Sequence, residues 1–203
     1  MWPSASSESI PAETETRRRR GRRIALIILA ICAAPTVAAW LAYFIWQPQS
    51  RLNYGELIDA RLLADPQLSD MDGKPFRLSQ LRGKWVMLQI DSGSCGEACR
   101  RNLVYMRQLR IGQGKDMDRI ERVWLLTDHA APGAGLLREF EGTRIARAAG
   151  SVLLAGFPPA PGASDHIYLI DPLGNLMLRF PSDPDPRRMS NDLARLLRAS
   201  RIG

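Results

Sequence analysis

Cysteine and histidine are scarce in this chain of 203 residues, which contains three cysteines and two histidines. Cys32 lies inside a long apolar run, where a cysteine acts as a small apolar residue. Cys95 and Cys99 are then the only cysteines left in the globular part, with three residues between them. Their scarcity limits the pair to three interpretations: a redox pair, a metal clip or a structural disulfide.

A basic stripe is also missing from the globular part of the chain. The net charge is +7, but six closely spaced arginines account for most of it: Arg17, Arg18, Arg19, Arg20, Arg22 and Arg23. A protein that binds nucleic acid needs basic residues spread over a folded face. The charge pattern therefore argues against nucleic-acid binding.

Charge is absent from residues 24–46, IALIILAICAAPTVAAWLAYFIW. At 1.5 Å per residue, this run is long enough to cross a hydrocarbon core of about 30 Å. A cleavable signal peptide is the alternative, but its apolar region is shorter and ends in small residues. Here the run ends in Trp40, Tyr43, Phe44 and Trp46, rings that favour the membrane interface. We predict an uncleaved transmembrane helix over residues 24–46.

The arginines precede this helix, and positive charge flanks the cytoplasmic side of membrane helices. The sequence thus predicts a single-pass protein of the bacterial inner membrane with a cytoplasmic segment over residues 1–23, of which 1–16 are expected to be disordered. Residues 47–65 are expected to form a linker, and residues 66–203 a globular domain in the periplasm. In that compartment disulfides persist.

Hydrophobic periodicity gives the order of elements in the domain. We expect a hairpin at Asp72-Gly73, a helix following the cysteines, strands over 85–90, 122–127, 166–171 and 176–180, and further helices over 135–149 and from 190 or 191 to 200. This order predicts an α/β, thioredoxin-like fold with a central mixed sheet flanked by helices. It places the cysteines at the carboxyl end of a central strand, where open α/β sheets bind ligands.

Cys95 and Cys99 are expected in the first turn of the helix that follows this strand. Residues four apart lie on the same helix face, so both sulfurs reach a common point. The positive end of the helix dipole favours thiolate, the form that exchanges disulfides and binds Cu(I). Arg100 and Arg101 act in the same direction, whereas Glu97 opposes them.

The spacing of the pair leaves its chemistry open. A disulfide here closes a loop of five residues, which removes little entropy from the unfolded chain, so a purely structural role is disfavoured. Redox pairs usually have two intervening residues rather than three. The wider spacing still allows a disulfide and also allows a metal between the sulfurs.

Three stretches, DGKPFRLSQLRGKWVMLQI with CGEAC, VWLLTDHAAP and HIYLIDPLGNLMLRF, resemble the Sco/SenC family of copper-binding, thioredoxin-fold proteins. The resemblance covers roughly residues 68 to 180. It implies that the C-x-x-x-C pair and a downstream histidine hold copper for delivery to the binuclear copper centre of cytochrome c oxidase. It also implies a single N-terminal membrane anchor.

The chain departs from the family pattern at two places. Gly96 and Arg100 stand where the family has prolines beside its cysteines. The family histidine falls at Ala163, three residues before His166. The resemblance therefore suggests Cys95, Cys99 and a displaced His166 as ligands of Cu(I). Neither His129 nor Asp128 is assigned a ligand role, although Asp128 matches an acidic position of the family.

The resulting prediction is a membrane-anchored assembly factor for cytochrome c oxidase. Its redox pair, Cys95 and Cys99, delivers Cu(I) to the oxidase's copper-bearing subunit or reduces the cysteines of that subunit or of another assembly factor. One alternative is a general thiol-disulfide oxidoreductase, although C-x-x-C and a proline directly before residues 167–170 are both lacking. A peroxidase is disfavoured because Thr-x-x-Cys is absent. A non-catalytic thioredoxin-like scaffold is the remaining alternative.

Overall fold

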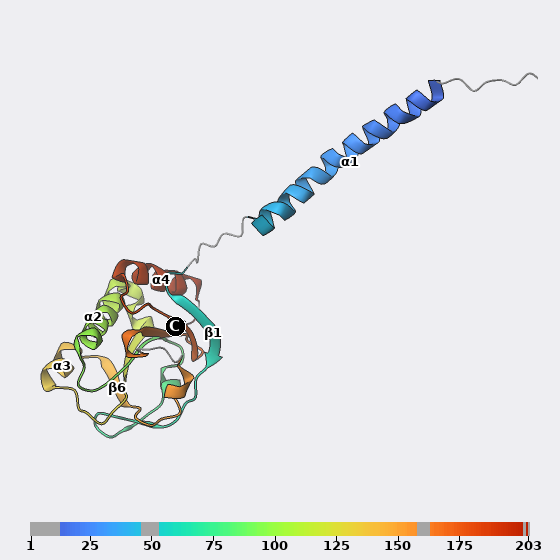
Figure 1. The fold of residues 1–203 in the computed structure, drawn as a ribbon. Helices are drawn as coiled ribbons and strands as arrows, with labels where there is room; N and C mark the ends of the chain where they lie inside the picture. The colour runs from blue at the N-terminus through green and yellow to red at the C-terminus, as the bar shows by residue number, and fades with distance from the viewer. Residues whose placement is uncertain (1–12, 46–52, 158–162, 201, 203) are drawn as a thin grey trace, which may run out of the picture. The chain divides into compact units, whose positions relative to one another are not determined.

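The structure, a computed structural model, describes residues 13–45, 53–157, 163–200 and 202 (Figure 1). It contains two compact units, divided between Arg51 and Leu52, which are described separately. The predictions of disorder for residues 1–12, of the last residue of the transmembrane helix at 46 and of a linker for residues 47–52 lie outside the described residues.

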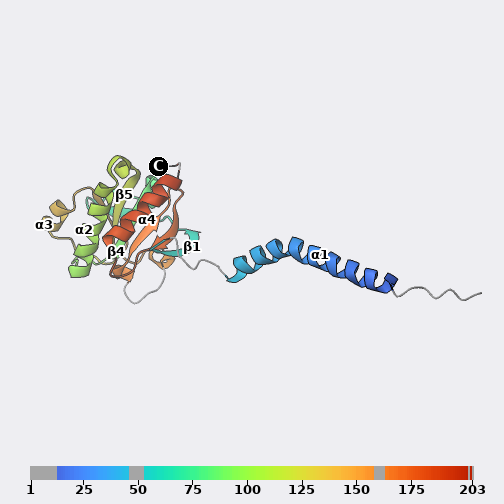
Figure 2. The same ribbon diagram turned by 90° about the horizontal axis from the view of Figure 1, so that it is seen from above.

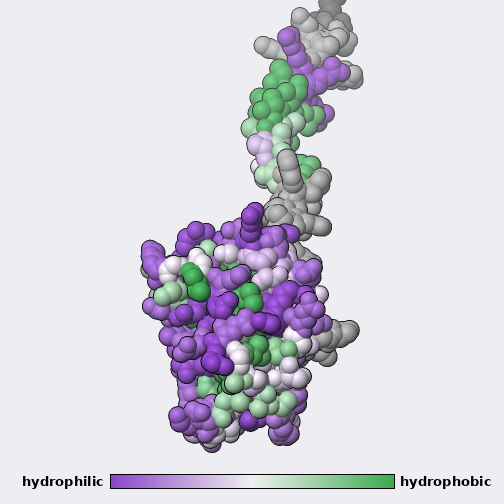
Figure 3. All heavy atoms as spheres, turned by 90° about the vertical axis from the view of Figure 1, so that its left-hand side faces the viewer, coloured by the Kyte–Doolittle hydropathy of each residue, from purple (hydrophilic) through white to green (hydrophobic). Residues whose placement is uncertain are grey.

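The first unit contains α1, Glu13–Ile45, which continues through Pro35. Residues 13–16, expected to be disordered, instead begin this helix; acidic residues such as Glu13 and Glu15 are favoured in a first helical turn. The stretch Arg20–Leu41 is long and apolar enough to cross a membrane. Figure 3 shows its apolar band, in contrast to the mostly hydrophilic face of the second unit in that view.

The second unit is built on one sheet of eight strands in the order β1-β8-β7-β4-β5-β6-β2-β3. The central strands β4, β5 and β6 are parallel, and the others pair antiparallel. This is the mixed sheet of the predicted thioredoxin-like fold. The strands are β1 Glu56–Leu62, β2 Leu68–Asp70, β3 Pro75–Phe76, β4 Trp85–Asp91, β5 Ile120–Leu126, β6 Thr143–Arg147, β7 Ile167–Ile170 and β8 Asn175–Arg179.

Four α-helices and four short 3-10 helices complete the described part of the chain. Three α-helices belong to the second unit: α2 Glu97–Gly112, α3 Ala134–Glu139 and α4 Pro186–Ala199. The 3-10 helices are η1 Leu78–Leu81, η2 Gly114–Arg119, η3 Leu154–Gly156 and η4 Ala163–Asp165. The helix α4 begins earlier than expected because the carboxylate of Asp185, rather than Ser190 or Asn191, accepts hydrogen bonds from the first backbone N–H groups.

Two predicted boundaries are wrong. Residues 56–62, assigned to the linker, form β1 and pair with β8 at the edge of the sheet. The helix expected over 135–149 ends at Glu139, and β6 follows it and pairs parallel with β5. Gly142, with φ +78°, separates the two elements in a conformation that favours glycine, and the branched side chains of Thr143 and Ile145 suit a strand.

Each face of the sheet has its own core, since side chains alternate along a strand. On one face, Leu88, Leu125 and Tyr168 pack against residues outside the α-helices, such as Leu153 and Phe157. The other face is covered by helices (Figure 2), with Met106 of α2 and Leu193 of α4 in one cluster. Leu136 of α3 packs with a further cluster on this helix-covered face. The strand β4 is buried along its length, as its apolar run predicted.

Candidate functional site

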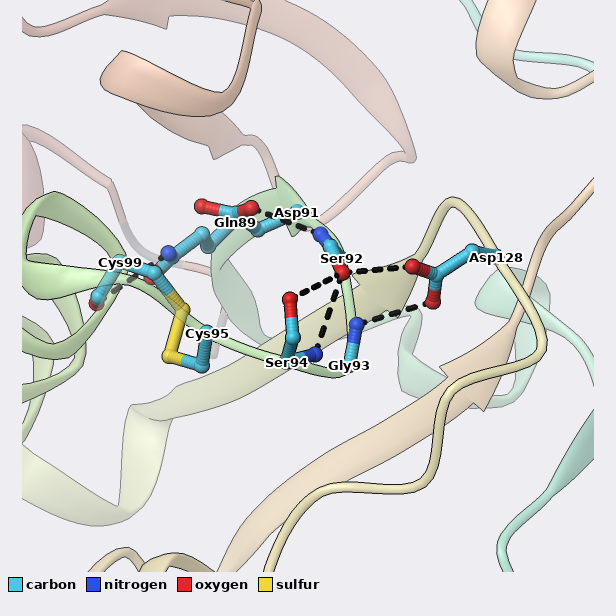
Figure 4. The surroundings of a disulfide bond; sticks show 8 residues. All are labelled: Gln89, Asp91, Ser92, Gly93, Ser94, Cys95, Cys99 and Asp128. Carbon is cyan, nitrogen blue, oxygen red and sulfur yellow. Dashed lines mark hydrogen bonds between the residues drawn. A yellow bond between two sulfur atoms is a disulfide. The ribbon is translucent and has the colours of Figure 1, made fainter.

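The two predicted cysteines are joined at the carboxyl end of β4. Cys95 and Cys99 form a disulfide with their Cα atoms 5.2 Å apart (Figure 4). Cys99 lies in the first turn of α2, as expected. Cys95 does not lie on the helix, because Gly96 is the N-cap residue; its backbone has φ +42°, in the left-handed region that side chains other than glycine rarely adopt.

The two sulfurs differ in their accessibility. Cys99 is fully buried at 0% exposure and packs with Leu103, Trp124 and Phe140, whereas Cys95 is partly exposed at the rim of this cluster. Thiol-disulfide exchange requires an approaching thiolate to reach a sulfur. Cys95 is therefore the sulfur that a partner can reach, and Cys99 is the one that stays within the protein.

A buried amide connects β4 to the start of α2. Gln89 is fully buried, and its Nε2 donates a hydrogen bond of 3.2 Å to the carbonyl oxygen of Cys99. Its Oε1, like both side-chain polar atoms of Asn102 and Nε1 of Trp124, is buried without a partner among the described residues. Gln89 was not among the predicted site residues, although it is the one polar residue in the apolar run of β4. Its hydrogen bond fixes the first turn of α2 over the strand.

A carboxylate from the next loop holds the residues that precede Cys95. Asp128, which follows β5, accepts hydrogen bonds from the Ser92 hydroxyl at 2.5 Å and the Gly93 N–H at 3.0 Å (Figure 4), as well as from the Ala130 N–H at 3.2 Å. These bonds, that of Gly93 first, lower the pKa of Asp128. Asp128 thus acts as a clasp, because its carboxylate joins the loop after β5 to the loop after β4. Its acidic match to the family was the available signal.

Asp91 adds a second carboxyl group at the end of β4. Burial raises its pKa, and the negative charges of Asp165 and Asp128 act in the same direction, while hydrogen bonds from Ser92 and Gln89 oppose the rise. The carboxyl end of β4 therefore carries negative charge beside the disulfide. Of the two arginines expected to favour thiolate, Arg100 forms an ion pair of 2.8 Å with Glu139 of α3.

The described contacts of His166 are with residues other than the cysteines. Its Nδ1 lies 2.7 Å from the carbonyl oxygen of Phe180, and its ring contacts Tyr168 edge-on with centroids 6.2 Å apart. Tyr168 packs on the face of the sheet opposite to Cys99, and side chains two apart share a face. The ring of His166 thus lies beside Tyr168, and its role as a copper ligand stays a prediction.

No group of three histidine, cysteine or acidic side chains in the described ranges is arranged to hold a metal. His129 is exposed, and its carbonyl oxygen accepts a long hydrogen bond, 3.4 Å, from Arg147. The donor set that suits Cu(I) as a cargo is therefore the cysteine pair in its reduced form. Two thiolates are soft ligands, and they match the preference of Cu(I).

Comparison with known proteins agrees with this architecture. The family model described as transmembrane-like, thioredoxin-like, C-terminal domain matches residues 85–200, more than half of the chain. The chain belongs to this family. The match covers the strand β4, the cysteine pair and all later elements of the thioredoxin-like sheet and its helices. A search of curated protein sequences found no match.

Solved structures show the same thioredoxin-like fold. Copper-bound ScoI from Bradyrhizobium japonicum aligns with a TM-score of 0.52 at 20% identity, over 66% of this chain and 99% of that one. Copper-bound yeast Sco1 aligns with a TM-score of 0.57 at 18% identity, over 68% and 94%. The resemblance of this thioredoxin-like chain to the Sco/SenC family is confirmed at the level of the fold.

A structure with different chemistry in its name aligns about equally well. The thioredoxin domain of a thiol-disulfide oxidoreductase from Bacteroides vulgatus has a TM-score of 0.52 at 17% identity, over 70% of this chain and 99% of that one. The fold is therefore common to copper-bound proteins and to an oxidoreductase. The fold therefore does not decide between copper binding and thiol-disulfide exchange in this chain. The decision depends on its own cysteines and their surroundings.

Proposed function

We propose that this protein is a membrane-anchored, Sco-like thiol-disulfide factor that serves the copper centre of cytochrome c oxidase by reducing the cysteines of its copper-bearing subunit. The observation that carries the proposal is the disulfide at the carboxyl end of β4, with Cys95 accessible and Cys99 buried. In this reading α1 is an uncleaved anchor in the bacterial inner membrane, with the N-terminus cytoplasmic and the second unit periplasmic.

The reduced pair performs the exchange in two steps. The Cys95 thiolate attacks one sulfur of the partner's disulfide, so that a mixed disulfide forms and one partner thiolate leaves. The Cys99 thiolate then attacks the Cys95 sulfur, which closes the Cys95–Cys99 bond and releases the second partner thiolate. Two electrons pass to the partner, and the protons lost by the two thiols balance those taken up by the partner's thiolates.

Delivery of Cu(I) is the second form of the same proposal. The copper-bound neighbours ScoI and Sco1 support it, and two thiolates are sufficient for a two-coordinate Cu(I) cargo. Because the described contacts of His166 are with Phe180 and Tyr168, we expect the two cysteines alone to hold the ion. The disulfide form cannot carry it, so loading requires prior reduction.

A general periplasmic thiol-disulfide oxidoreductase is the second candidate function. The neighbour from Bacteroides vulgatus favours it, since a protein of that activity has the same fold. It predicts exchange with unrelated disulfides at rates similar to that with the oxidase subunit. The Sco-like proposal predicts a preference for the copper-bearing subunit.

The test uses the full chain in detergent with Cys32→Ser, so that Cys95 and Cys99 are the only thiols. Reduced protein is mixed with the oxidised copper-bearing subunit and, separately, with oxidised insulin, and the free thiols produced are counted by mass after alkylation. Rapid reduction of the subunit alone supports the proposal. Equal rates on both substrates would favour the general oxidoreductase, and no reaction with either would overturn thiol exchange.

A parallel anaerobic titration with Cu(I) against a competing chelator separates the two forms of the proposal. One ion retained by the reduced protein, lost in Cys95→Ser and Cys99→Ser and unchanged in His166→Ala, would support two-thiolate carriage. Weakened retention in His166→Ala would instead assign the histidine to the copper site. Failure to compete with the chelator would retire copper delivery and leave thiol reduction as the function.

A further inference from the structure

The loop that carries Cys95 is bound to a second loop far away in the sequence. Asp128, after β5, accepts hydrogen bonds from the Ser92 hydroxyl and the Gly93 N–H, 36 and 35 residues earlier in the chain. A backbone bond of 3.0 Å from the Thr127 N–H to the Asp91 carbonyl oxygen joins the same two segments. The last residues before Cys95 are thus held from the side by the β5–α3 connection.

We propose that Asp128 is a positioning residue that keeps Cys95 within bonding reach of Cys99 when the pair is reduced, and thereby stabilises the disulfide. The inference rests on the proposed thiol-disulfide function and names the residue that sets its equilibrium. The described contacts of Asp128 include neither sulfur; it acts through the backbone and hydroxyl groups of the loop.

A short chain of hydrogen bonds leads from Asp128 to Cys95. The Ser92 hydroxyl donates to Asp128 and accepts from the Ser94 N–H at 3.1 Å, and the two serine hydroxyls lie 2.8 Å apart. The Cys95 N–H then donates to the Ser92 carbonyl oxygen at 3.2 Å. This turn presents Cys95 to Cys99 with φ +42°, a conformation that an unsupported chain avoids.

Close packing supports the same arrangement from another direction. A Cβ atom on Gly93 would overlap the carbonyl oxygen and carbon of Ala130, so the backbones of the two loops touch where only glycine fits. The bond from the Ala130 N–H to Asp128 holds this part of the second loop in place. The cysteine loop is therefore fixed by both hydrogen bonds and backbone contact.

The expected sign follows from the effective concentration of one thiol beside the other. If the loop stays bent after reduction, little entropy is lost when the disulfide forms again. If the clasp is removed, the reduced loop gains freedom, the dithiol is favoured, and the reduction potential becomes less negative. The reaction is balanced by glutathione: the disulfide and two molecules of reduced glutathione give the dithiol and one molecule of oxidised glutathione.

The experiment measures this equilibrium in the full chain in detergent, with Cys32→Ser throughout, in glutathione buffers of graded ratio. Asp128→Ala removes the clasp, and we expect the equilibrium constant for disulfide formation to fall about tenfold, which corresponds to about 30 mV. Asp128→Asn keeps an oxygen that accepts from the Gly93 N–H, so we expect a smaller shift. Asp171→Ala is the matched control, since Asp171 accepts backbone hydrogen bonds in the turn after β7.

A large shift in Asp128→Ala, a smaller one in Asp128→Asn and none in Asp171→Ala would support the inference. Equal shifts in Asp128→Ala and Asp128→Asn would overturn it in favour of a charge effect, because both variants remove the same charge. An unchanged potential in Asp128→Ala, while the unmodified pair still cycles, would overturn it and leave the proposed function intact. A pair that never reacts with glutathione would overturn both.

Ser92→Ala keeps the experiment decisive if Asp128→Ala does not fold. It removes the hydroxyl group alone and leaves the bond from Gly93, so a shift in the same direction, smaller than tenfold, is expected. An unchanged potential in that variant would contradict the chain of hydrogen bonds from Asp128 to Cys95.

Discussion

Two aspartates in the second unit hold loops by the same chemistry but over very different distances along the chain. Asp171, after β7, accepts bonds from the N–H groups of Leu173 at 2.9 Å and Asn175 at 2.8 Å, and from the Asn175 side chain at 3.0 Å. The donors in these three bonds lie within four residues of Asp171 in the sequence. Asp128 instead joins its own loop to Ser92 and Gly93.

The two loops lie at opposite ends of the central strands, and each end is called an edge below. Since β7 runs antiparallel to β4, with Val86 beside Ile170, Asp171 is at the edge where β4 begins and Asp128 is at the edge where β4 ends. Only the second edge carries cysteines. A local clasp such as that of Asp171 shapes a turn, whereas a long-range clasp such as that of Asp128 lets one part of the chain control the chemistry of another.

The largest expected effect is the loss of activity when either cysteine is replaced, since only one of the two edges carries the reacting groups. Cys95→Ser should abolish thiol exchange, because it removes the attacking thiolate. Cys99→Ser should stop after the first step, with Cys95 held in a mixed disulfide with the partner, because the second step needs the Cys99 thiolate. The loop is short, so the stability lost with the disulfide should be only about 2 kcal/mol. Activity is measured by reduction of the oxidised copper-bearing subunit, and stability by chemical denaturation.

The two cysteine variants should also differ in stability, because the two cysteines differ in burial. Cys99 is fully buried in an apolar cluster, so the hydroxyl of Cys99→Ser should cost more stability than that of Cys95→Ser. Unfolding of either variant at room temperature would indicate that the disulfide is mainly structural. Complete reduction of the copper-bearing subunit by either variant would contradict the two-step mechanism.

The next prediction compares one glycine from each loop. Gly93→Ala should destabilise the protein by about 2 to 3 kcal/mol, because the added Cβ meets the Ala130 backbone, which cannot move without breaking the clasp. Gly174→Ala should cost less, about 1 to 2 kcal/mol, since its Cβ has no neighbour closer than 3.6 Å and only the left-handed φ of +96° is unfavourable. Denaturation midpoints of the two variants measure the difference.

The two glycine variants should also differ in the reduction potential of the cysteine pair. Gly93→Ala should also shift the reduction potential of the pair, whereas Gly174→Ala should leave it at the original value. If both variants lost the same stability and neither changed the potential, the contact between the two loops at Gly93 would have no role in the chemistry.

The different reach of the two clasps also explains what could be predicted from the sequence. The strands predicted over 166–171 and 176–180, on either side of the turn at Asp171, follow from patterns within one short segment, and β4 and the cysteine pair were predicted from one apolar run and one short motif. The clasp of Asp128 was not, because its partners precede it by 35 and 36 residues. A pattern within one segment carries no record of such a contact.

The same reasoning applies to the elements that were predicted wrongly. The strand β6 depends on pairing with β5, and β1 on pairing with β8, so neither is visible in local periodicity alone. Cys95 was expected on the helix because the spacing of the cysteines fits a helical turn. A glycine at residue 96 becomes the N-cap instead, and this moves Cys95 off the helix and into the loop that Asp128 holds.

A smaller effect is expected from Asp171→Ala. The loss of its hydrogen bonds should destabilise the protein by about 1 to 2 kcal/mol, since the backbone donors of the turn regain partners in water. Hydrogen exchange should accelerate at the amides of Leu173 and Asn175. Faster exchange in the loop of Cys95 as well would show that the two edges are coupled, contrary to the comparison.

The smallest expected effect is a pH dependence confined to the cysteine edge. Hydrogen bonds lower the pKa of Asp128 in the folded protein, so its contribution to stability is present above the ordinary carboxyl pKa of about 3.9 and is lost as the pH falls through the folded value. Burial raises the pKa of Asp91, which gives the opposite slope: stability falls as the pH rises from about 3.9 towards the raised value.

The two carboxyl groups can therefore be separated by their signs. Asp128→Asn should remove part of the loss of stability below about pH 4, and Asp91→Asn should flatten the decline above it. Denaturation midpoints recorded across this range, with Asp171→Asn as the control from the other edge, provide the measurement. A steeper loss at low pH in Asp128→Asn would mean that the carboxylate does not gain its hydrogen bonds on folding, and the clasp would then have no energetic basis.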